Sequence, residues 1–268
     1  MSIWRRKSLA ILMSEASEDE KGLKRTLSSR ALVAMGIGAI IGAGLFSLTG
    51  IAAADHAGPA VTLSFVLAAV GCAFAGLCYA EFASMIPVAG SAYTYSYATM
   101  GEFIAWIIGW DLVLEYALGA ATVGVSWGAY LNKLFAHFGI MLPPEFTNAP
   151  AEGGIINLPA IFIVCILSLL LIRGTKESAF VNNILVVVKV IVVVVFIILG
   201  WQHINPDFHV PYIPEFVPAH IDPVTGEKVG EFGGMSGIAA GAGLVFFAFI
   251  GFDAVSTAAQ EAKDPQKG

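Results

Sequence analysis

The sequence predicts an all-α integral membrane protein with six transmembrane helices. Three observations predict this class: 57% of the 268 residues are hydrophobic, only 13% are charged, and the mean hydropathy is +0.79. A soluble domain has about a quarter charged and about 45–50% apolar residues. Disorder is excluded because disordered chains are poor in apolar residues. The 29 Gly, 18 Phe and five Trp suit helices packed in lipid.

Charge and cysteine content exclude other classes. The formal net charge is −6, which offers no basic surface for nucleic acid. Cys72, Cys78 and Cys165 lie in apolar runs without Cys-x-x-Cys spacing, so we expect neither a disulfide framework nor a metal site, and no cofactor. The first 30 residues are charged and lack the apolar core of a cleavable signal.

Uncharged runs place the helices, because roughly 20 residues are needed to cross a ~30 Å hydrocarbon core. Two of the helices contain internal charges: Asp111 and Glu115 in one, and Lys189 in another. The β-branched run around Lys189 lacks the alternating polarity of a barrel strand. The first five helices are predicted at 31–54, 57–85, 102–132, 154–173 and 178–201, and the sixth lies within 236–268.

Lysine and arginine positions predict the orientation, because cytoplasmic loops carry an excess of them. The predicted outer side holds only Lys133 and Lys228. We therefore expect a multi-pass protein of the cell membrane, with a cytoplasmic tail over 1–30 and an extracellular loop over 202–235. The cations of the cytoplasmic side are Arg5, Arg6, Lys7, Lys21, Lys24, Arg25, Arg30, Arg173, Lys176, Lys263 and Lys267.

The first helix is rich in glycine over Gly36–Gly50. Each glycine costs an isolated helix roughly 1 kcal/mol relative to alanine. Either Gly38 and Gly42 form a G-x-x-x-G packing face, or the helix unwinds near Gly42 to Gly44. Unwinding frees carbonyls at the end of the first half and N–H groups at the start of the second, which suit an ammonium and a carboxylate.

The sixth helix carries Phe246-Phe-Ala-Phe-Ile-Gly-Phe-Asp253, with a glycine and then an acid inside an apolar run. Two glycine-interrupted spans are typical of discontinuous helices that face each other in a transporter. The alternative is a kinked packing helix capped by Asp253. Phe246 and Phe247 adjoin the break and are candidates for a lid over a substrate, although a Phe stripe in lipid more often serves packing.

Four motifs carry a resemblance to a known family. They are Gly36–Phe46, Tyr79–Tyr95, Gly109-Trp-Asp-Leu-Val-Leu-Glu-Tyr116 and Phe246–Ser256, in this order. With them the chain after Leu27 resembles the N-terminal portion of the amino acid–polyamine–organocation (APC) superfamily, most of all its bacterial cationic-amino-acid-transporter branch.

The resemblance implies a leucine-transporter (LeuT) fold, in which substrate binds between broken helices 1 and 6 of two five-helix inverted repeats. Residues 31–201 would form the first repeat, and 236–268 would form broken helix 6 and the start of a cytoplasmic loop. Because family members continue beyond helix 6, we expect a chain that ends early, as a fragment or a truncated form.

The implied binding site consists of unwound backbone. The substrate carboxylate would accept from the N–H groups of Ala43, Gly44 and Leu45, and its ammonium would donate to the carbonyls of Ile40 and Ile41. The other predicted substrate-binding residues are Gly42, Glu115, Phe246, Phe247, Ala248, Ile250 and Gly251.

Lys189 lies at predicted mid-membrane, where a lysine costs about 2.5–3.5 kcal/mol on insertion scales. One interpretation is a proton-titrated group that changes its contacts with the first helix during transport. The resemblance supports this interpretation, because a helix-5 lysine can occupy the place of sodium in sodium-coupled relatives. The other interpretation is a structural ammonium bonded to unwound carbonyls.

We therefore expect secondary active transport of an L-amino acid by proton symport in a lipid membrane. A non-transporting amino-acid receptor or half-transporter subunit is the alternative. Asp111 and Glu115 are four residues apart on one helical face, as a catalytic pair would be. Because the chain offers no nucleophile, metal site or oxyanion site to accompany them, we expect no catalytic residues and no enzyme.

Overall fold

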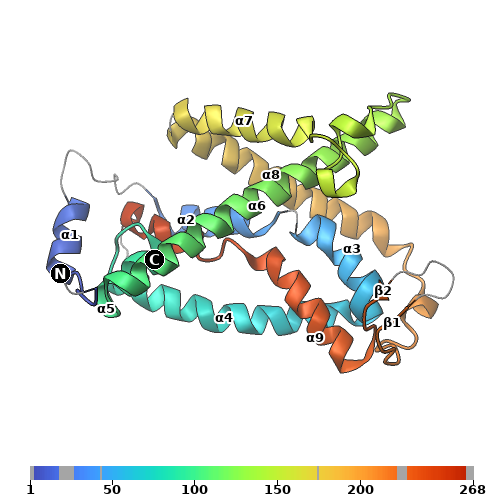
Figure 1. The fold of residues 1–268 in the computed structure, drawn as a ribbon, viewed down its shortest axis with the longest axis horizontal. Coiled ribbons are helices and arrows are strands. Elements are labelled where there is room, and N and C mark those ends of the chain that lie inside the picture. Colours follow the sequence, from blue (N-terminus) through green and yellow to red (C-terminus); the bar gives the residue numbers. More distant parts are fainter. Residues whose placement is uncertain (1–2, 18–26, 43, 174, 222–227, 264–268) are drawn as a thin grey trace.

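The structure is a computed structural model that describes residues 3–17, 27–42, 44–173, 175–221 and 228–263. It is built mostly from helices, as the composition predicts (Figure 1). The α-helices are α1 (Leu9–Ser17), α2 (Ser29–Ile40), α3 (Thr49–Ala52), α4 (Val61–Met85), α5 (Ser91–Thr99), α6 (Glu102–His137), α7 (Leu158–Arg173), α8 (Thr175–Trp201), α9 (Gly234–Val245) and α10 (Ala254–Thr257).

Short turns and one small sheet connect these helices. Strands β1 (His220–Ile221) and β2 (Lys228–Val229) pair antiparallel in the loop before α9. The helical turns are the π-helical η1 (Gly44–Leu48) and η2 (Ala53–Ala57) and the 3-10 turns η3 (Gly58–Ala60), η4 (Pro144–Phe146), η5 (Pro150–Glu152), η6 (Pro206–His209), η7 (Phe246–Phe249) and η8 (Ala258–Glu261).

Within the described ranges, four helical runs are long and apolar enough to cross a membrane: Ala31–Met85, Glu102–His137, Val181–Trp201 and Gly234–Glu261. The first run contains two of the six predicted spans, because helical turns continue from η1 to the start of α4. Helix α7 has 16 residues, fewer than the roughly 20 that a perpendicular span needs. Helix α6 extends to His137, beyond the end predicted at 132.

Small residues let α4 and α9 pack closely. A Cβ at Gly241 of α9 would lie 2.7 Å from Oγ of Ser64 on α4. Ser64 is completely buried, and its hydroxyl donates a 2.9 Å hydrogen bond to the carbonyl of Ile238. Between helices in lipid, such close approach and interhelical hydrogen bonding replace the hydrophobic driving force. Ala68 of α4 and Val245 of α9 are buried in one cluster with Ala52 of α3.

The loop between α8 and α9 folds back over the start of α4. The amide of Gly233 donates a 2.7 Å hydrogen bond to the carbonyl of His56, and the hydroxyls of Thr62 and Tyr212 are hydrogen-bonded. Gly58 has φ +57° where the chain turns into α4, a conformation that favours glycine. This loop lies at the end of α4 opposite to α5 (Figure 1).

Candidate functional site

The first glycine-rich helix is interrupted in its middle. Helix α2 ends at Ile40, and Ile41 takes an extended conformation (φ −73°, ψ 99°) while its amide still donates to the carbonyl of Ile37 at 3.0 Å. Helical structure resumes at Gly44 in η1. Ala43, a predicted substrate-binding residue, lies outside the described residues.

The sixth predicted helix is interrupted as well. Helix α9 ends at Val245 and continues as the single turn η7. Ile250 is then extended (φ −55°, ψ 133°), and Gly251 has φ +106°, which side-chain-bearing residues rarely adopt. Helix α10 begins at Ala254. The glycine signal in the sequence thus marks a real change of backbone direction.

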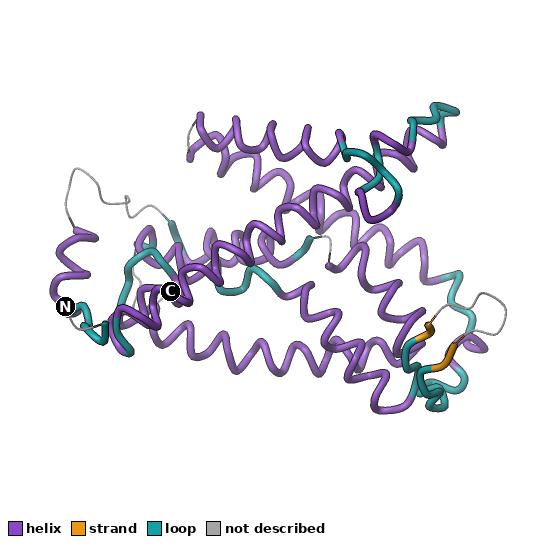
Figure 2. The backbone as a smooth tube through the Cα atoms, viewed as in Figure 1, coloured by secondary structure: helices purple, strands orange, loops and turns teal. Residues whose placement is uncertain are grey.

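The two interruptions lie against each other. A Cβ at Gly44 would overlap the backbone of Ala248, and a Cβ at Gly251 would lie 3.1 Å from the carbonyl oxygen of Ala39. Figure 2 shows both loop segments in the middle of the helical body. Because neither glycine has a side chain, the backbones of the two breaks come into direct contact.

This arrangement presents backbone groups of both polarities. A helix leaves the N–H groups of its first turn without partners in that helix, and η1 begins with Gly44 and Leu45. The last carbonyls of α2, including that of Ile40, are likewise left without amide partners in their own helix. The partial charges at these two ends favour an anion and a cation respectively.

Gly38 and Gly42, the two glycines of the proposed packing face, have different surroundings. Gly38 packs tightly, because a Cβ there would lie 2.6 Å from Cγ2 of Val186 on α8. A Cβ at Gly42 would meet no atom within 4 Å. Gly38 and Gly42 therefore do not form one G-x-x-x-G packing face.

Lys189 of α8 reaches α2. Its Nζ donates a 2.7 Å hydrogen bond to the carbonyl oxygen of Gly38, and the side chain is half-buried. Gly38 lies two residues before the end of α2 at Ile40. A cation within an apolar helix is thereby joined to the helix that unwinds.

Asp253 and Tyr116 form a second link that the sequence reasoning missed. The Tyr116 hydroxyl on α6 donates to Oδ2 of Asp253 at 2.7 Å. Asp253 is 4% exposed, and its other oxygen, Oδ1, is buried with no hydrogen-bond partner among the described residues. Asp253 occupies the N-cap position of α10, but its side chain makes no capping hydrogen bond there, so a side-chain cap, one part of the alternative, is wrong. The signal available in the sequence was an acidic residue, Asp253, two positions after Gly251 inside an apolar run.

The remaining predicted residues differ in how deeply they are buried near this site. Glu115 is half-buried on α6, one residue before Tyr116, and is an electrostatic neighbour of Asp253. Ala248 is buried in η7, whereas Phe246 is 46% exposed and Phe247 half-buried. The structure thus brings the two breaks and Asp253 together.

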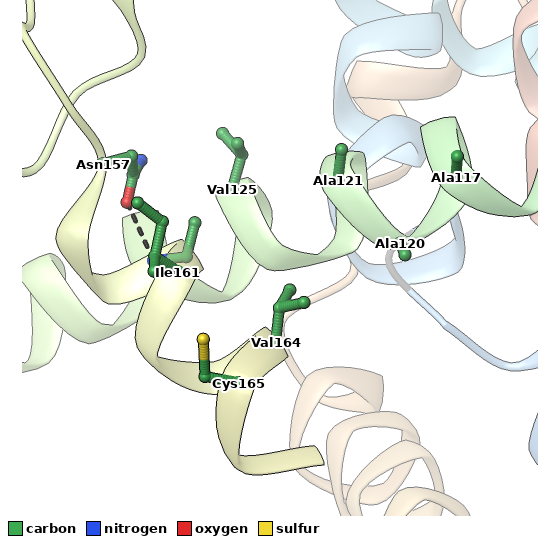
Figure 3. Close-up of a pocket in the computed structure, with 9 residues that line it drawn as sticks. Ala117, Ala120, Ala121, Val125, Asn157, Ile161, Val164 and Cys165 are labelled. Carbon is green, nitrogen blue, oxygen red and sulfur yellow. Dashed lines mark hydrogen bonds between the residues drawn. The ribbon is translucent and has the colours of Figure 1, made fainter. Parts of the chain in front are cut away.

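The pocket drawn in Figure 3 is a different feature. It is a cavity of about 380 Å³ between α6 and α7, with a mostly apolar lining that includes Ala121, Val125, Ile161 and Cys165. At one end, Oδ1 of Asn157 accepts a 3.0 Å hydrogen bond from the amide of Ala160. None of the predicted binding residues lines this pocket, and its walls offer little to an ammonium or a carboxylate.

Comparison with known proteins agrees with the membrane class. A model of the amino acid permease family matches residues 27–267. A branched-chain amino acid permease of Bacillus subtilis (strain 168) is 47% identical over 270 residues, covering 99% of this chain and 54% of the relative. A methylthioribose transporter of the same organism is 42% identical over 268 residues, with the same two shares.

A more distant relative comes from an animal. Cationic amino acid transporter 4 of Mus musculus is 36% identical over 263 residues, covering 94% of this chain and 38% of the relative. The chain spans about half the length of the bacterial relatives. All three names describe transporters rather than enzymes.

Proposed function

The chain belongs to the amino acid permease family of the APC superfamily, and from this premise we propose that it is the N-terminal portion of a secondary transporter for an L-amino acid. One observation carries the proposal: two helices break at the same place, where Gly44 meets the backbone of Ala248. Broken helices that face each other are where transporters of this kind bind substrate.

In the proposed complex, the substrate lies along the two breaks. Its carboxylate accepts from the N–H groups of Gly44 and Leu45 at the start of η1, and from that of Ala43, which lies outside the described residues. Its ammonium donates to the carbonyls of Ile40 and Ile41 and to those of the second break, between Phe246 and Ile250. The polarity of each helix end matches the group assigned to it.

The proposed architecture is the first five-helix repeat of a LeuT fold followed by the broken sixth helix. The first apolar run contains two spans, α2 and α4, and the other three runs contain one each. With the short helix α7 as a further span, the chain accommodates six crossings. The excess of Lys and Arg on one side supports a cytoplasmic N-terminus in the cell membrane.

Proton coupling is assigned to Lys189. Its ammonium is held by the Gly38 carbonyl on α2, so loss of its proton removes one link between α8 and the helix that carries the first break. Because protonation of Lys189 changes a hydrogen bond to the broken helix, it can shift the conformation of that helix and so couple a proton to substrate binding.

The test uses the complete protein in proteoliposomes. Vesicles loaded with an unlabelled L-amino acid are assayed for accumulation of the same labelled amino acid by exchange, across a panel of cationic and neutral substrates. We expect exchange with at least one L-amino acid, and competition only from compounds that carry both an α-ammonium and an α-carboxylate.

Two further competitors test which substrate groups the site requires. The matching primary amine without a carboxylate should compete poorly, because it leaves the N–H groups of η1 unpaired. Methylthioribose, named for one relative, should not replace the amino acid. A response to methylthioribose alone, or equal competition by the amine, would contradict the proposed site.

A further inference from the structure

Residues 3–13, called the strap from here on, are docked on the start of α6. The amide of Glu102 donates to the carbonyl of Arg5, and that of Phe103 donates to the carbonyl of Ile3, both at 3.0 Å. These are among the amides that α6 leaves without partners in its own helix. The strap therefore supplies acceptors for two amides at the start of α6.

The strap is packed against α5 and the residues just before it. Leu12 is 6% exposed and packs with Ile86 and Tyr95 in a buried cluster. The Lys7 ammonium lies 5.8 Å from the centre of the Tyr97 ring. The strap is thus fixed in position on the rest of the protein.

Most of the large apolar side chains of the strap are exposed. Leu12 is the one large apolar side chain of this segment that is buried, among the described residues. In water, a concentration of exposed apolar side chains in one short segment is unfavourable, and it often marks an interaction site. The exposed side chains, with their exposed fractions, are Ile3 (58%), Trp4 (58%), Leu9 (47%), Ile11 (46%) and Met13 (37%).

Two exposed cations adjoin this apolar surface. Arg5 and Arg6 follow Trp4 directly in the sequence, and both are exposed. The acidic residues of the tail begin only at Glu15. Tryptophan beside Arg and Lys is the combination that lies at the boundary between headgroups and acyl chains.

The position of the strap fits such a boundary. Helix α1 lies beyond the Met85 end of α4 and beside the start of α6, where the membrane-spanning segments end (Figure 1). In that view α1 runs across the direction of α4, as a helix lying in the membrane plane does. The positive charge of the strap matches the negative surface of a cytoplasmic leaflet.

We propose that the strap is an interfacial anchor that binds the anionic phospholipid surface of the cytoplasmic leaflet. Arg5 and Arg6 contact lipid phosphates, while Trp4 and exposed apolar side chains of α1 enter the headgroup boundary. A second copy of the chain, or another part of it, is a less fitting occupant because two exposed cations, Arg5 and Arg6, adjoin the exposed apolar side chains. Because Leu12 packs on Ile86 and Tyr95, binding of the strap to anionic lipid would also hold α5 and the residues before it in place.

The test measures amide hydrogen exchange of the strap in the complete protein. The protein is placed in nanodiscs of phosphatidylcholine, in nanodiscs of an equal mixture of phosphatidylcholine and phosphatidylglycerol, and in neutral detergent. We expect exchange in the strap to be slower in the anionic nanodiscs by about fivefold for each arginine that contacts the surface. High salt should reduce this difference.

Matched variants separate lipid binding from folding. Arg5→Gln/Arg6→Gln should abolish the difference between the two nanodiscs, whereas Arg5→Lys/Arg6→Lys should retain most of it. Lys133→Gln, near the opposite end of α6, is the control and should behave as wild type. Equal exchange in both nanodiscs, a difference that survives in the Gln variant, or equal protection in detergent would each overturn the proposal, the last in favour of a protein contact.

Discussion

Nζ of Lys189 and the carbonyl oxygen of Gly38 are 2.7 Å apart, and this hydrogen bond ties α8 to α2 just before α2 ends. The contact depends on glycine, because a Cβ at position 38 would lie 2.6 Å from Cγ2 of Val186. A hydrogen bond to the ammonium offsets part of the cost of a cation in an apolar helix.

Gly38→Ala should therefore push α8 away from α2 and weaken this hydrogen bond. Overpacking costs about 1–3 kcal/mol, partly offset by about 1 kcal/mol of helix propensity. We expect a lower melting temperature in detergent. Adding Val186→Ala should make room for the new methyl group and recover stability relative to Gly38→Ala alone. A double variant no more stable than the single one would show that the close contact at Gly38 is not the cause.

Lys189→Met removes the titrating group and keeps most of the side-chain volume. In proteoliposomes of the complete protein, we expect uptake driven by a pH gradient to be lost while equilibrium binding survives in part. Lys133→Met, an exposed cation elsewhere on the chain, is the matched control and should respond like wild type. If Lys189→Met still responds fully to the gradient, the lysine is structural, and Glu115 becomes the next candidate.

Tyr116→Phe should destabilise the contact between α6 and the second break. It deprives a buried carboxylate of its hydroxyl donor, and hydrogen bonds to charged groups contribute about 1.5–3 kcal/mol. Thermal unfolding of the purified protein measures the loss, with Tyr93→Phe, on the exposed side of α5, as control.

Asp253→Asn distinguishes charge from hydrogen bonding at the same place. The amide oxygen still accepts from Tyr116, so a stability close to wild type would assign the effect to the hydrogen bond. Equal unfolding temperatures for Tyr116→Phe, Tyr93→Phe and wild type would mean that this link contributes nothing measurable.

The orientation is tested by single cysteines in a variant that lacks Cys72, Cys78 and Cys165. With the N-terminus in the cytoplasm, a cysteine at Lys176 should resist an impermeant reagent in intact cells, and one at Lys133 should react. Both should react after the membrane is permeabilised. The reverse pattern in intact cells would invert the proposed topology.

The helical class was predictable from the sequence because composition alone separates a lipid-packed chain from a soluble one. The glycine clusters also indicated where the helices break, since glycine disfavours a helix and permits the φ +106° of Gly251. The end of α6 at His137 was less predictable, because a helix can continue past the apolar run that the membrane requires.

The partners across the site could not be predicted, because they depend on tertiary contacts between distant segments. Nothing local to Asp253 indicates Tyr116, which lies 137 positions away. Nothing local to Lys189 selects the carbonyl of Gly38, 151 positions away, over another unwound carbonyl. Glycine count alone also could not separate packing at Gly38 from the open surroundings of Gly42.

The most direct test of the central claim is equilibrium binding of a labelled L-amino acid to Gly44→Ala and Gly50→Ala variants of the complete protein. A Cβ at Gly44 would overlap the backbone of Ala248 between the two breaks, whereas one at Gly50 would meet no atom within 4 Å. Both variants add the same methyl group to the same stretch of chain. We expect Gly44→Ala to lose binding and Gly50→Ala to bind like wild type, with both proteins present in the membrane at similar levels. Wild-type affinity in a folded Gly44→Ala protein would contradict a substrate site at the junction of the two breaks.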